Sequence, residues 1–474
     1  MNPRIEATKR RTGRQATVNS PWQRRCACLA VLLGWQAGAA LGRIPAPPPP
    51  TPAAARHAGA ALASARDTPS ARGGAPVLVT VRSHSDPTSP EYLFIAQAAD
   101  TFNRSQRQYR IEFGSPLRRD YATWVHREAA NGTLPCLLDF DGPYLAEFAW
   151  PQYLQPIDRY VPQAMLDDFL PSIVAQGSYR GRLYSLGQFE SGLVLWGNRR
   201  YLRAAGVRIP SLAAPWSLAE FEQALARLAT LKQLAYPINF SFFNGRGNEF
   251  FPYAYAPIVQ GFGGDLIDRR TLGTASGVLD GPASVDAVRH LKRWYAAGWA
   301  SVHEQPTDFA TGKVALYWNG HWSYRAARKA LGPDLVLLPL PDFGHGIKTG
   351  MGSWGWAISS TCRAPAGAWA FLASLLTPAA ILHMSDVSGA VPARRSALRQ
   401  SALYGAGGPL RMIVQQLALG GVPRPATPAY GTISLAFRAA IDNSVRGADV
   451  HAELSKAAAR IDRQIATHHG YPYP

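Results

Sequence analysis

The chain has 474 residues, of which 47% are hydrophobic and 17% are charged, so it can bury a large core and should divide into more than one domain. Its formal net charge is +18, but positions 1–76 hold eleven basic and two acidic residues, which accounts for half of that charge. The remaining charge is scattered and forms no basic run interleaved with aromatic residues, which argues against specific nucleic-acid binding.

Residues 1–42 have the layout of a secretory signal peptide. Basic residues up to Arg25 precede an apolar run from Cys26 to Leu41, which ends in the small residues that a cleavage site requires. The run is too short for a typical membrane-spanning helix, although an uncleaved anchor remains an alternative. Cys26 and Cys28 stand at the start of the apolar run and not after it, so they do not support a lipid anchor. We therefore expect a periplasmic protein.

Residues 43–76 are rich in proline, alanine and glycine and contain few large apolar side chains. This composition predicts a disordered tether ahead of a globular part that spans residues 77–474. Only Cys136 and Cys362 belong to the globular part, and their spacing fits no metal site. A disulfide between them and a pair of free thiols both remain open. The His468-His469 pair reads as part of a frayed tail, and we expect neither a metal nor a cofactor.

The globular part begins with a strand, a helix and a second strand. Val77–Val81 reads as a strand, Ser89-Pro90-Glu91 supplies an N-cap and first turn, and Tyr109–Phe113 reads as the next strand. A β-α-β unit implies a parallel sheet that binds ligands beyond the carboxyl ends of its strands. His84 and Ser85 follow the first strand and either contact a ligand or form a solvated turn.

Two acidic residues stand next to apolar strands further along the chain. Asp141 ends the apolar run that begins at Leu137, where it either accepts hydrogen bonds from ligand hydroxyls or caps a helix. Glu190 lies beside Phe189 in a short polar loop before an apolar strand, so it is a candidate acceptor for two hydroxyls. A solvated loop is the alternative for Glu190.

The middle of the chain combines a structural signal with a candidate contact loop. Trp216-Ser217-Leu-Ala-Glu220-Phe221 predicts a helix that starts with a capping box and a hydrophobic staple. The following stretch, 239–248, mixes aromatic residues, amides and glycines. We consider three of its residues candidate ligand contacts: Phe243, Asn244 and Arg246. Further helices are expected from Asp280 and across 363–377, 434–445 and 450–466.

The stretch 308–360 contains apolar runs of four to six residues bounded by glycine or proline, which favours buried strands of an α/β sheet. Polar and aromatic side chains stand at the ends of these strands, namely Trp318, Asn319, Trp322, Ser353 and Trp354. Aromatic faces with a few polar groups suit a sugar, whose C–H face stacks while its hydroxyls form hydrogen bonds. The same tryptophans also suit a core position, because strand alternation places Trp354 on one face with Trp356.

Three stretches resemble the signature of bacterial extracellular solute-binding proteins of ABC importers, in particular the sugar- and maltodextrin-binding type. Phe309-Ala-Thr-Gly-Lys-Val-Ala precedes a strand that ends in Gly320-His-Trp322. Gly181–Gly206 and Gly352–Pro378 match two other parts of the pattern, and the resemblance extends from about Val77 to Ala466. One departure is Cys136, which stands where the family usually has an aspartate.

The resemblance implies an α/β chain with a two-lobed, type II-like periplasmic-binding-protein fold that closes around one ligand by a hinge motion. Lobe 1 would comprise about 77–190 and 341–395, and lobe 2 about 191–340 and 396–474. Glu190, Trp322 and Trp354 are the leading contacts. The implied function is capture of a sugar or oligosaccharide by a monomer that is not an enzyme and delivers it to the membrane subunits of an ABC permease.

Two other functions remain as alternatives. An anionic solute such as a phosphorylated polyol would require Arg118, Arg119 or Arg246, because phosphate favours guanidinium groups. A secreted carbohydrate-active enzyme would use Asp141 and Glu190 as its acid and base, but no nucleophile elbow, zinc motif or phosphate loop accompanies them. The sequence does not identify the sugar.

Overall fold

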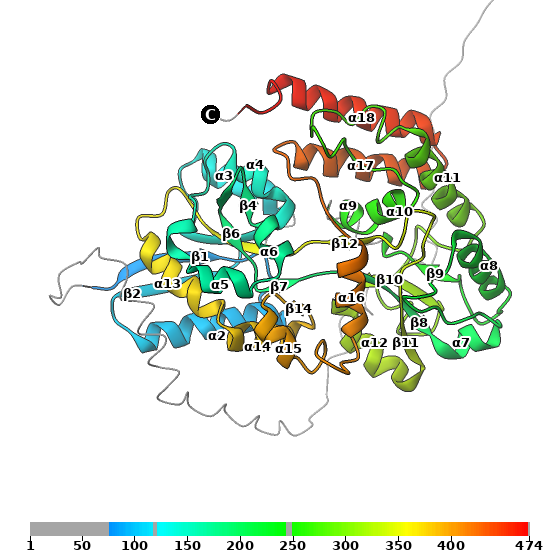
Figure 1. The fold of residues 1–474 in the computed structure, drawn as a ribbon, viewed down its shortest axis with the longest axis horizontal. Helices are drawn as coiled ribbons and strands as arrows, with labels where there is room; N and C mark the ends of the chain where they lie inside the picture. Colours follow the sequence, from blue (N-terminus) through cyan, green and yellow to red (C-terminus); the bar gives the residue numbers. More distant parts are fainter. Residues whose placement is uncertain (1–74, 117–120, 243–248, 473–474) are drawn as a thin grey trace, which may run out of the picture. The chain divides into compact units, whose positions relative to one another are not determined.

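The computed structural model describes residues 75–116, 121–242 and 249–472 (Figure 1). The proposed signal peptide and nearly all of the proposed tether lie outside these residues. So do the candidates Phe243, Asn244 and Arg246, and the alternative anion ligands Arg118 and Arg119. Within the described residues, no single helix is long and apolar enough to cross a membrane, and one pair of helices passes that test only when joined across a 64° bend.

The first sheet has the strand order β2-β1-β3-β13-β6. Its strands are β1 (Val77–Arg82), β2 (Tyr109–Gly114), β3 (Leu137–Asp141), β6 (Ser185–Leu186) and β13 (Trp354–Ile358). Strands β1, β2 and β3 are parallel, whereas β13 runs antiparallel to β3. Alternate side chains enter two different apolar clusters: Trp356 and Ile358 lie in one, and Ala357 lies in the other.

Helix α2 (Pro90–Ser105) connects β1 to β2, so the expected β-α-β unit is confirmed. The Ser89 side chain caps this helix by accepting a hydrogen bond from the Tyr92 N–H, and Glu91 lies in its first turn. Ile95 and Ala99 are buried in the first cluster, where α2 packs against α13 and α14. The loop with His84 and Ser85 therefore lies at the carboxyl end of β1.

The second sheet has the strand order β11-β8-β10-β9. Its strands are β8 (Leu193–Asn198), β9 (Ile238–Asn239), β10 (Leu316–Gly320) and β11 (Leu335–Leu338). Strand β8 is buried along its whole length and lies antiparallel to both β10 and β11. Leu193 and Leu195 enter one apolar cluster and Val194 and Trp196 enter another, so this sheet too is covered on both faces.

The chain passes between the two sheets more than once. It leaves the first sheet after β6 and enters the second at β8, and it returns from β11 to β13. It crosses again between α15 (Arg395–Gln400), whose Ala397 belongs to a first-sheet cluster, and α16 (Arg411–Gly420), whose Ile413 belongs to a second-sheet cluster. Residues far apart in sequence therefore meet where the strands end.

The helices cover the faces of both sheets, and α17 packs along α18 (Figure 1). The other helices are α3 (Tyr121–Ala130), α4 (Leu145–Ala149), α5 (Gln163–Asp168), α6 (Pro171–Gln176), α7 (Arg199–Ala204), α8 (Leu218–Ala229), α9 (Phe250–Ala254), α10 (Ala256–Gly261), α11 (Pro282–Ala296), α12 (Tyr324–Leu331), α13 (Pro365–Leu375), α14 (Pro378–Ser388), α17 (Tyr430–Val445) and α18 (Val450–Thr467). Short strands complete the fold, namely β4 (Ser178–Tyr179), β5 (Arg182–Leu183), β7 (Phe189–Glu190), β12 (Thr349–Met351), β14 (Val391–Pro392) and β15 (Gly421–Pro423).

Several local expectations are confirmed. Helix α8 begins with the expected capping box, in which Ser217 and Glu220 each bind the backbone of the other, and Trp216 lies 6.3 Å from Phe221 between ring centroids. The structure also settles the open question about the cysteines, because Cys136 and Cys362 form a disulfide. This bond ties the start of β3 to the turn that follows β13.

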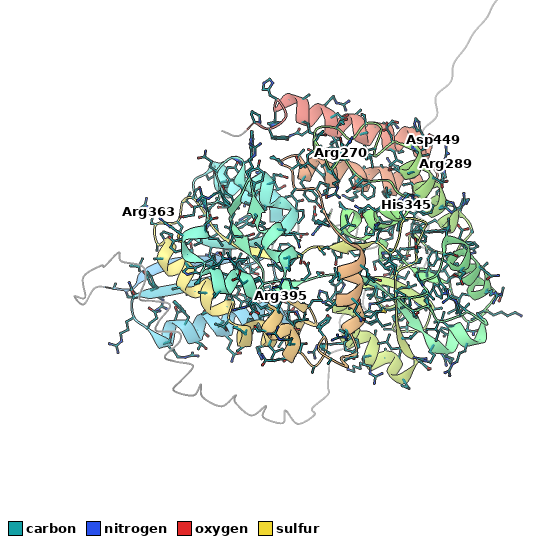
Figure 2. The ribbon with its side chains drawn as sticks, viewed as in Figure 1. Arg270, Arg289, His345, Arg363, Arg395 and Asp449 are labelled. Carbon is teal, nitrogen blue, oxygen red and sulfur yellow. A yellow bond between two sulfur atoms is a disulfide. The ribbon has the colours of Figure 1, made fainter. Side chains whose placement is uncertain are left out.

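Charge is spread over the molecule, as the sequence suggests. Figure 2 shows Arg363 in the turn before α13 and Arg395 at the start of α15, whereas Arg289 projects from α11 beside the second sheet. Arg270 lies on a loop near the C-terminal helices. The labelled arginines therefore belong to separate surfaces rather than to one basic patch.

Candidate functional site

Strands β3 and β13 bring two predicted contacts together. In their antiparallel register Trp354 is the partner of Asp141, and the Gly142 N–H donates a 2.8 Å hydrogen bond to the Ser353 carbonyl. Asp141 is buried, and Trp354 is half-buried against both apolar clusters of the first sheet. Part of the Trp354 indole therefore packs against the core while the rest borders polar groups, and its stacking on a sugar stays a prediction.

The main surprise is Arg424, which sequence reasoning missed. Its guanidinium binds both oxygens of Asp141, with 2.7 Å between Nη1 and Oδ2, and it also lies 2.9 Å from Glu249 Oε2. The guanidinium stacks over the Tyr253 ring at 5.3 Å. A fork that grips one carboxylate with two hydrogen bonds is the geometry that arginine favours over lysine. The predicted acceptor Asp141 is therefore held by a cation.

Glu249 closes this charged group from the second-sheet side. It accepts hydrogen bonds from the Tyr144 and Tyr430 hydroxyls and from Ser434 Oγ. Burial raises the pKa of the Glu249 carboxyl, while the Arg424 guanidinium opposes that shift. One guanidinium thus faces two carboxylates, so the cluster carries no excess positive charge.

Glu190 is also buried, with 1% of its surface exposed, but its partners are neutral. Its oxygens accept hydrogen bonds from the backbone N–H groups of Ser191 and Gly352 and from Gln176 Nε2. Burial raises the pKa of the Glu190 carboxyl, and these hydrogen bonds offset only part of that effect. The expectation of a polar loop residue beside an apolar strand holds, but the residue is not solvated.

Gly352 lies between Glu190 and the Arg424 guanidinium that binds Asp141. A Cβ on this residue would lie 2.5 Å from Arg424 Nη2, so a larger residue here would require the guanidinium to shift away from its present position. Glycine at this position allows another group to approach the backbone closely. In the structure the group that approaches is the side chain of Arg424.

His84 lies against Trp354 and so borders the same group of side chains. The two rings are nearly parallel, with 3.2 Å between their centroids, and Tyr121 meets the indole edge-on. The imidazole Nδ1 lies 2.8 Å from Asp139 Oδ2. Burial lowers the pKa of His84, but the carboxylates of Asp139, Glu91 and Asp141 together outweigh that effect and raise the pKa overall. A ligand that stacks on this face of Trp354 would have to displace the imidazole.

Trp322 reaches the site from the second sheet. It is 42% exposed, and its ring lies 6.1 Å from the Tyr253 ring, which in turn contacts Arg424. The neighbouring His321 is buried, and burial lowers its pKa to about 3, so the imidazole is neutral. An exposed indole next to buried polar groups is consistent with the proposed role of Trp322 in binding.

Two predicted contacts lie in the core instead. Trp318 is 1% exposed, packs against Phe240, and donates a hydrogen bond from Nε1 to the Ala254 carbonyl. Asn319 is equally buried, donates to Ser241 Oγ and accepts from the Gly320 N–H. Trp318 thus takes the core position that the sequence left open as an alternative, and Asn319 is bonded within the protein, so a ligand contact by either residue stays a prediction.

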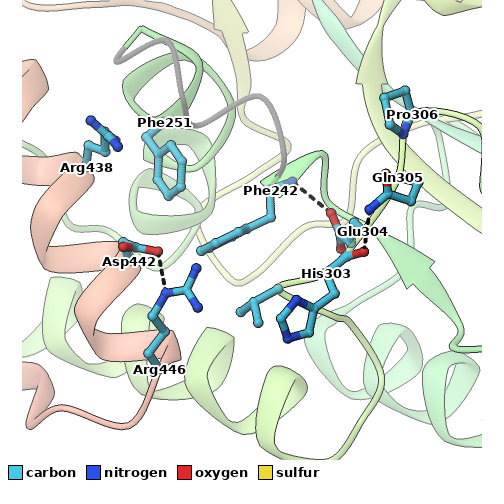
Figure 3. A pocket seen from close by; sticks show the side chains of 10 residues that line it. Phe242, Phe251, His303, Glu304, Gln305, Pro306, Arg438, Asp442 and Arg446 are labelled. Carbon is cyan, nitrogen blue, oxygen red and sulfur yellow. Dashed lines mark hydrogen bonds and ion pairs between the residues drawn. The ribbon is translucent and has the colours of Figure 1, made fainter. Parts of the chain in front are cut away.

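A separate cavity of about 470 Å³ lies beside the C-terminal end of α17 (Figure 3). Its walls include Phe242, His303, Glu304, Asp442 and Arg446. Burial raises the pKa of Glu304 to about 8, although that carboxylate accepts two backbone hydrogen bonds. None of the candidate contacts within the described residues lines this cavity, so it is distinct from the cluster around Trp354.

The fold and the sequence both resemble known proteins. The family model for bacterial extracellular solute-binding proteins matches residues 97–405. A maltotriose-binding protein of Pyrococcus abyssi is 24% identical over 230 residues, which cover 47% of this chain and 45% of that protein. A lipoprotein of Streptomyces antibioticus is 25% identical over 288 residues, which cover 58% of this chain and 61% of that protein. The chain thus matches only about half the length of these relatives.

Solved structures share the two-lobed fold. The GacH receptor of Streptomyces glaucescens, solved unliganded and with acarbose, superposes with a TM-score of 0.67 at 20% identity, over 84% of this chain and 99% of that one. A cyclic α-maltosyl-1,6-maltose binding protein of Arthrobacter globiformis superposes with a TM-score of 0.69 at 21% identity. The superposition covers 83% of this chain and 100% of that chain. Since the family model matches more than half of the chain, this protein belongs to the bacterial extracellular solute-binding protein family.

Proposed function

We propose that this protein captures a sugar or short oligosaccharide outside the cytoplasmic membrane and delivers it to an ABC permease. Membership of the solute-binding family supports a binding role. The relatives named above for maltotriose, acarbose and cyclic maltosyl-maltose support a saccharide as the ligand class. We propose further that the protein acts as a monomer whose two lobes close on the ligand.

The observation that carries the proposal is the cluster of Trp354, Asp141 and Arg424. The indole offers an apolar face to the C–H groups of a sugar ring, and the ion pair beside it offers a carboxylate acceptor and guanidinium donors to hydroxyls. Glu190, bonded to Gly352, would add a further acceptor, and Trp322, beside Tyr253, would add a further aromatic face. These are the group types that saccharide sites combine.

The same geometry argues against the two alternatives. A phosphorylated ligand requires excess positive charge, and among the described residues Arg424 offers none, because Asp141 and Glu249 already match it. A glycosidase requires one carboxyl to donate a proton and another to attack or activate water. Asp141 is engaged by a guanidinium and Glu190 by three neutral donors, so neither is poised for those steps.

Calorimetric titration of the purified chain tests the proposal. The panel should include maltotriose, mannobiose and a cyclic gluco-oligosaccharide, with a sugar phosphate as the anionic alternative. We expect saturable binding of at least one neutral saccharide and chromatographic recovery of that saccharide unchanged. Binding of the phosphate alone would favour the anionic alternative, and release of shorter sugars would favour an enzyme.

We also propose the roles of the remaining segments. Residues 1–42 would be a signal peptide and 43–76 a passive tether, because they combine a basic start, an apolar run and a stretch without core-forming side chains. Sequencing of the exported protein should find an N-terminus near 41–45, and full-length protein retained in the cytoplasm would contradict this assignment. The lobes would divide near residues 190, 340 and 395, where the chain changes sheets.

A further inference from the structure

Three ligating side chains converge beside β1, outside the saccharide cluster proper. His84, Glu91 and Asp139 each offer one nitrogen or oxygen atom, and these atoms all lie within 4.8 Å of one another. They come from three separate elements: the loop after β1, the first turn of α2, and β3. The fold therefore assembles the group from distant parts of the chain, and no local sequence spacing reveals it.

The carboxylate at the centre is already oriented by its surroundings. Asp139 is 1% exposed and accepts hydrogen bonds from Ser83 Oγ at 2.8 Å and from the His84 N–H at 2.7 Å. The His84 ring is fixed on its other side by the stack against Trp354. Such supporting contacts hold ligating side chains in place in metal sites.

A second, independent observation points to an occupant. Ser85 is 4% exposed, and its buried Oγ has no hydrogen-bond partner. The Glu91 carboxyl lies close enough for this hydroxyl to act on it as a weak hydrogen-bond donor and to lower its pKa, so the neighbour that engages Ser85 Oγ is one of the three ligating groups. A buried hydroxyl is normally hydrogen-bonded, so one that is not requires an explanation. Ser85 Oγ therefore lies next to Glu91, one of the three ligating groups.

We propose that His84, Glu91 and Asp139 bind a divalent transition-metal ion such as Zn²⁺, with Ser85 Oγ available as a fourth oxygen. One imidazole and two carboxylates form a nitrogen and oxygen donor set that suits zinc or manganese, whereas calcium and magnesium favour oxygen alone. Zinc bonds of about 2.0–2.2 Å require the ligand atoms to lie roughly 3.5 Å apart. Small side-chain rotations would bring the three groups to that separation. The ion would also balance the charge of two carboxylates that face one imidazole.

Titration of the chelator-stripped full chain with Zn²⁺ in the absence of sugar tests this site. We expect one equivalent to bind saturably, and Glu91→Gln to weaken the dissociation constant at least tenfold. Co²⁺ added in place of Zn²⁺ should give visible absorption bands that Glu91→Gln removes. Because no saccharide is present, the result does not depend on the proposed transport function.

A matched control separates this site from exposed histidines that bind zinc adventitiously. The double variant His468→Gln/His469→Gln removes a histidine pair at the end of the last helix and should leave the one-equivalent binding unchanged. A denaturant melt of Glu91→Gln checks that the variant is folded. No saturable binding, or binding that survives in Glu91→Gln and disappears in the double variant, would overturn the proposal and leave an adventitious ion only.

Discussion

Asp141 and Glu190 are both buried carboxylates at strand ends, but the protein compensates them in different ways. Asp141 is matched by the charge of Arg424, whereas Glu190 is surrounded by two backbone N–H groups and one amide. A guanidinium supplies opposite charge, and neutral donors supply only hydrogen bonds, so burial still raises the pKa of Glu190. The comparison shows that two acids which look alike in sequence need different partners to remain buried.

The largest loss of stability should follow from removing Arg424, the cation that pairs with Asp141. Arg424→Met leaves Asp141 and Glu249 buried without a counter-charge, which should lower the free energy of unfolding by roughly 3–5 kcal/mol. Denaturant melts at neutral pH measure the change. Lys456→Met, which breaks the exposed Lys456–Glu453 pair, is the matched control and should cost less than about 1 kcal/mol. Equal losses of unfolding free energy in Arg424→Met and Lys456→Met would show that the charge of Arg424 is not needed to keep Asp141 buried.

Replacing Glu190 should lower the free energy of unfolding by less, and it should change how that free energy depends on pH. Since its folded pKa is raised above the usual 4.5, the folded protein holds this proton to a higher pH than the unfolded chain does. The free energy of unfolding contributed by Glu190 is therefore full below pH 4.5 and falls as pH rises through the folded pKa. Glu190→Gln should flatten that slope while costing about 1–3 kcal/mol through lost acceptor geometry. Melts from pH 4 to 8 that show the same slope in both proteins would contradict this.

A third variant tests whether Trp354, the strand partner of Asp141, binds the ligand. Trp354→Ala should weaken saccharide binding by about 1–3 kcal/mol, roughly ten- to hundredfold, with a smaller loss of stability, because the indole is only half-buried. Trp318→Ala is the contrasting control, since that indole is fully buried and should cost roughly 3–5 kcal/mol of stability. Calorimetry and melts on both variants measure the two quantities. Unchanged affinity in Trp354→Ala would refute the stacking role.

Deleting residues 43–76 should change affinity and stability least. Neither carboxylate depends on this segment if it is a passive tether without core-forming residues. Affinity and melting temperature should both be unchanged in the deleted protein. A clear loss of either would show that the segment packs on the globular part.

Local signals in the sequence predicted local structure well. The capping box at Ser217 and Glu220 and the β-α-β unit that starts at Val77 depend on residues close in sequence, and both are present. Strand alternation also placed Trp354 and Trp356 on one face, and both pack in the same apolar cluster. The position of Trp318 was not predictable in this way, because it depends on Phe240 and Ala254, which come from other elements.

The charged part of the site could not be predicted for the same reason. Arg424 stands between two prolines in a stretch that reads as a loop, and its partner Asp141 is 283 positions away. The only available signal was one arginine in an otherwise apolar and proline-rich segment. The disulfide was left open because a pair separated by 226 positions follows from the fold and not from spacing.

The central claim is that a saccharide binds at Trp354, Asp141 and Arg424. A crystal structure of the chain with the saccharide that binds most tightly in the titration panel tests it most directly. We predict a sugar ring against the Trp354 indole, with its hydroxyls hydrogen-bonded to Asp141 and Arg424 and Glu190 close by. A saccharide seated instead in the cavity beside α17, with the Arg424 cluster unchanged and away from it, would contradict the claim.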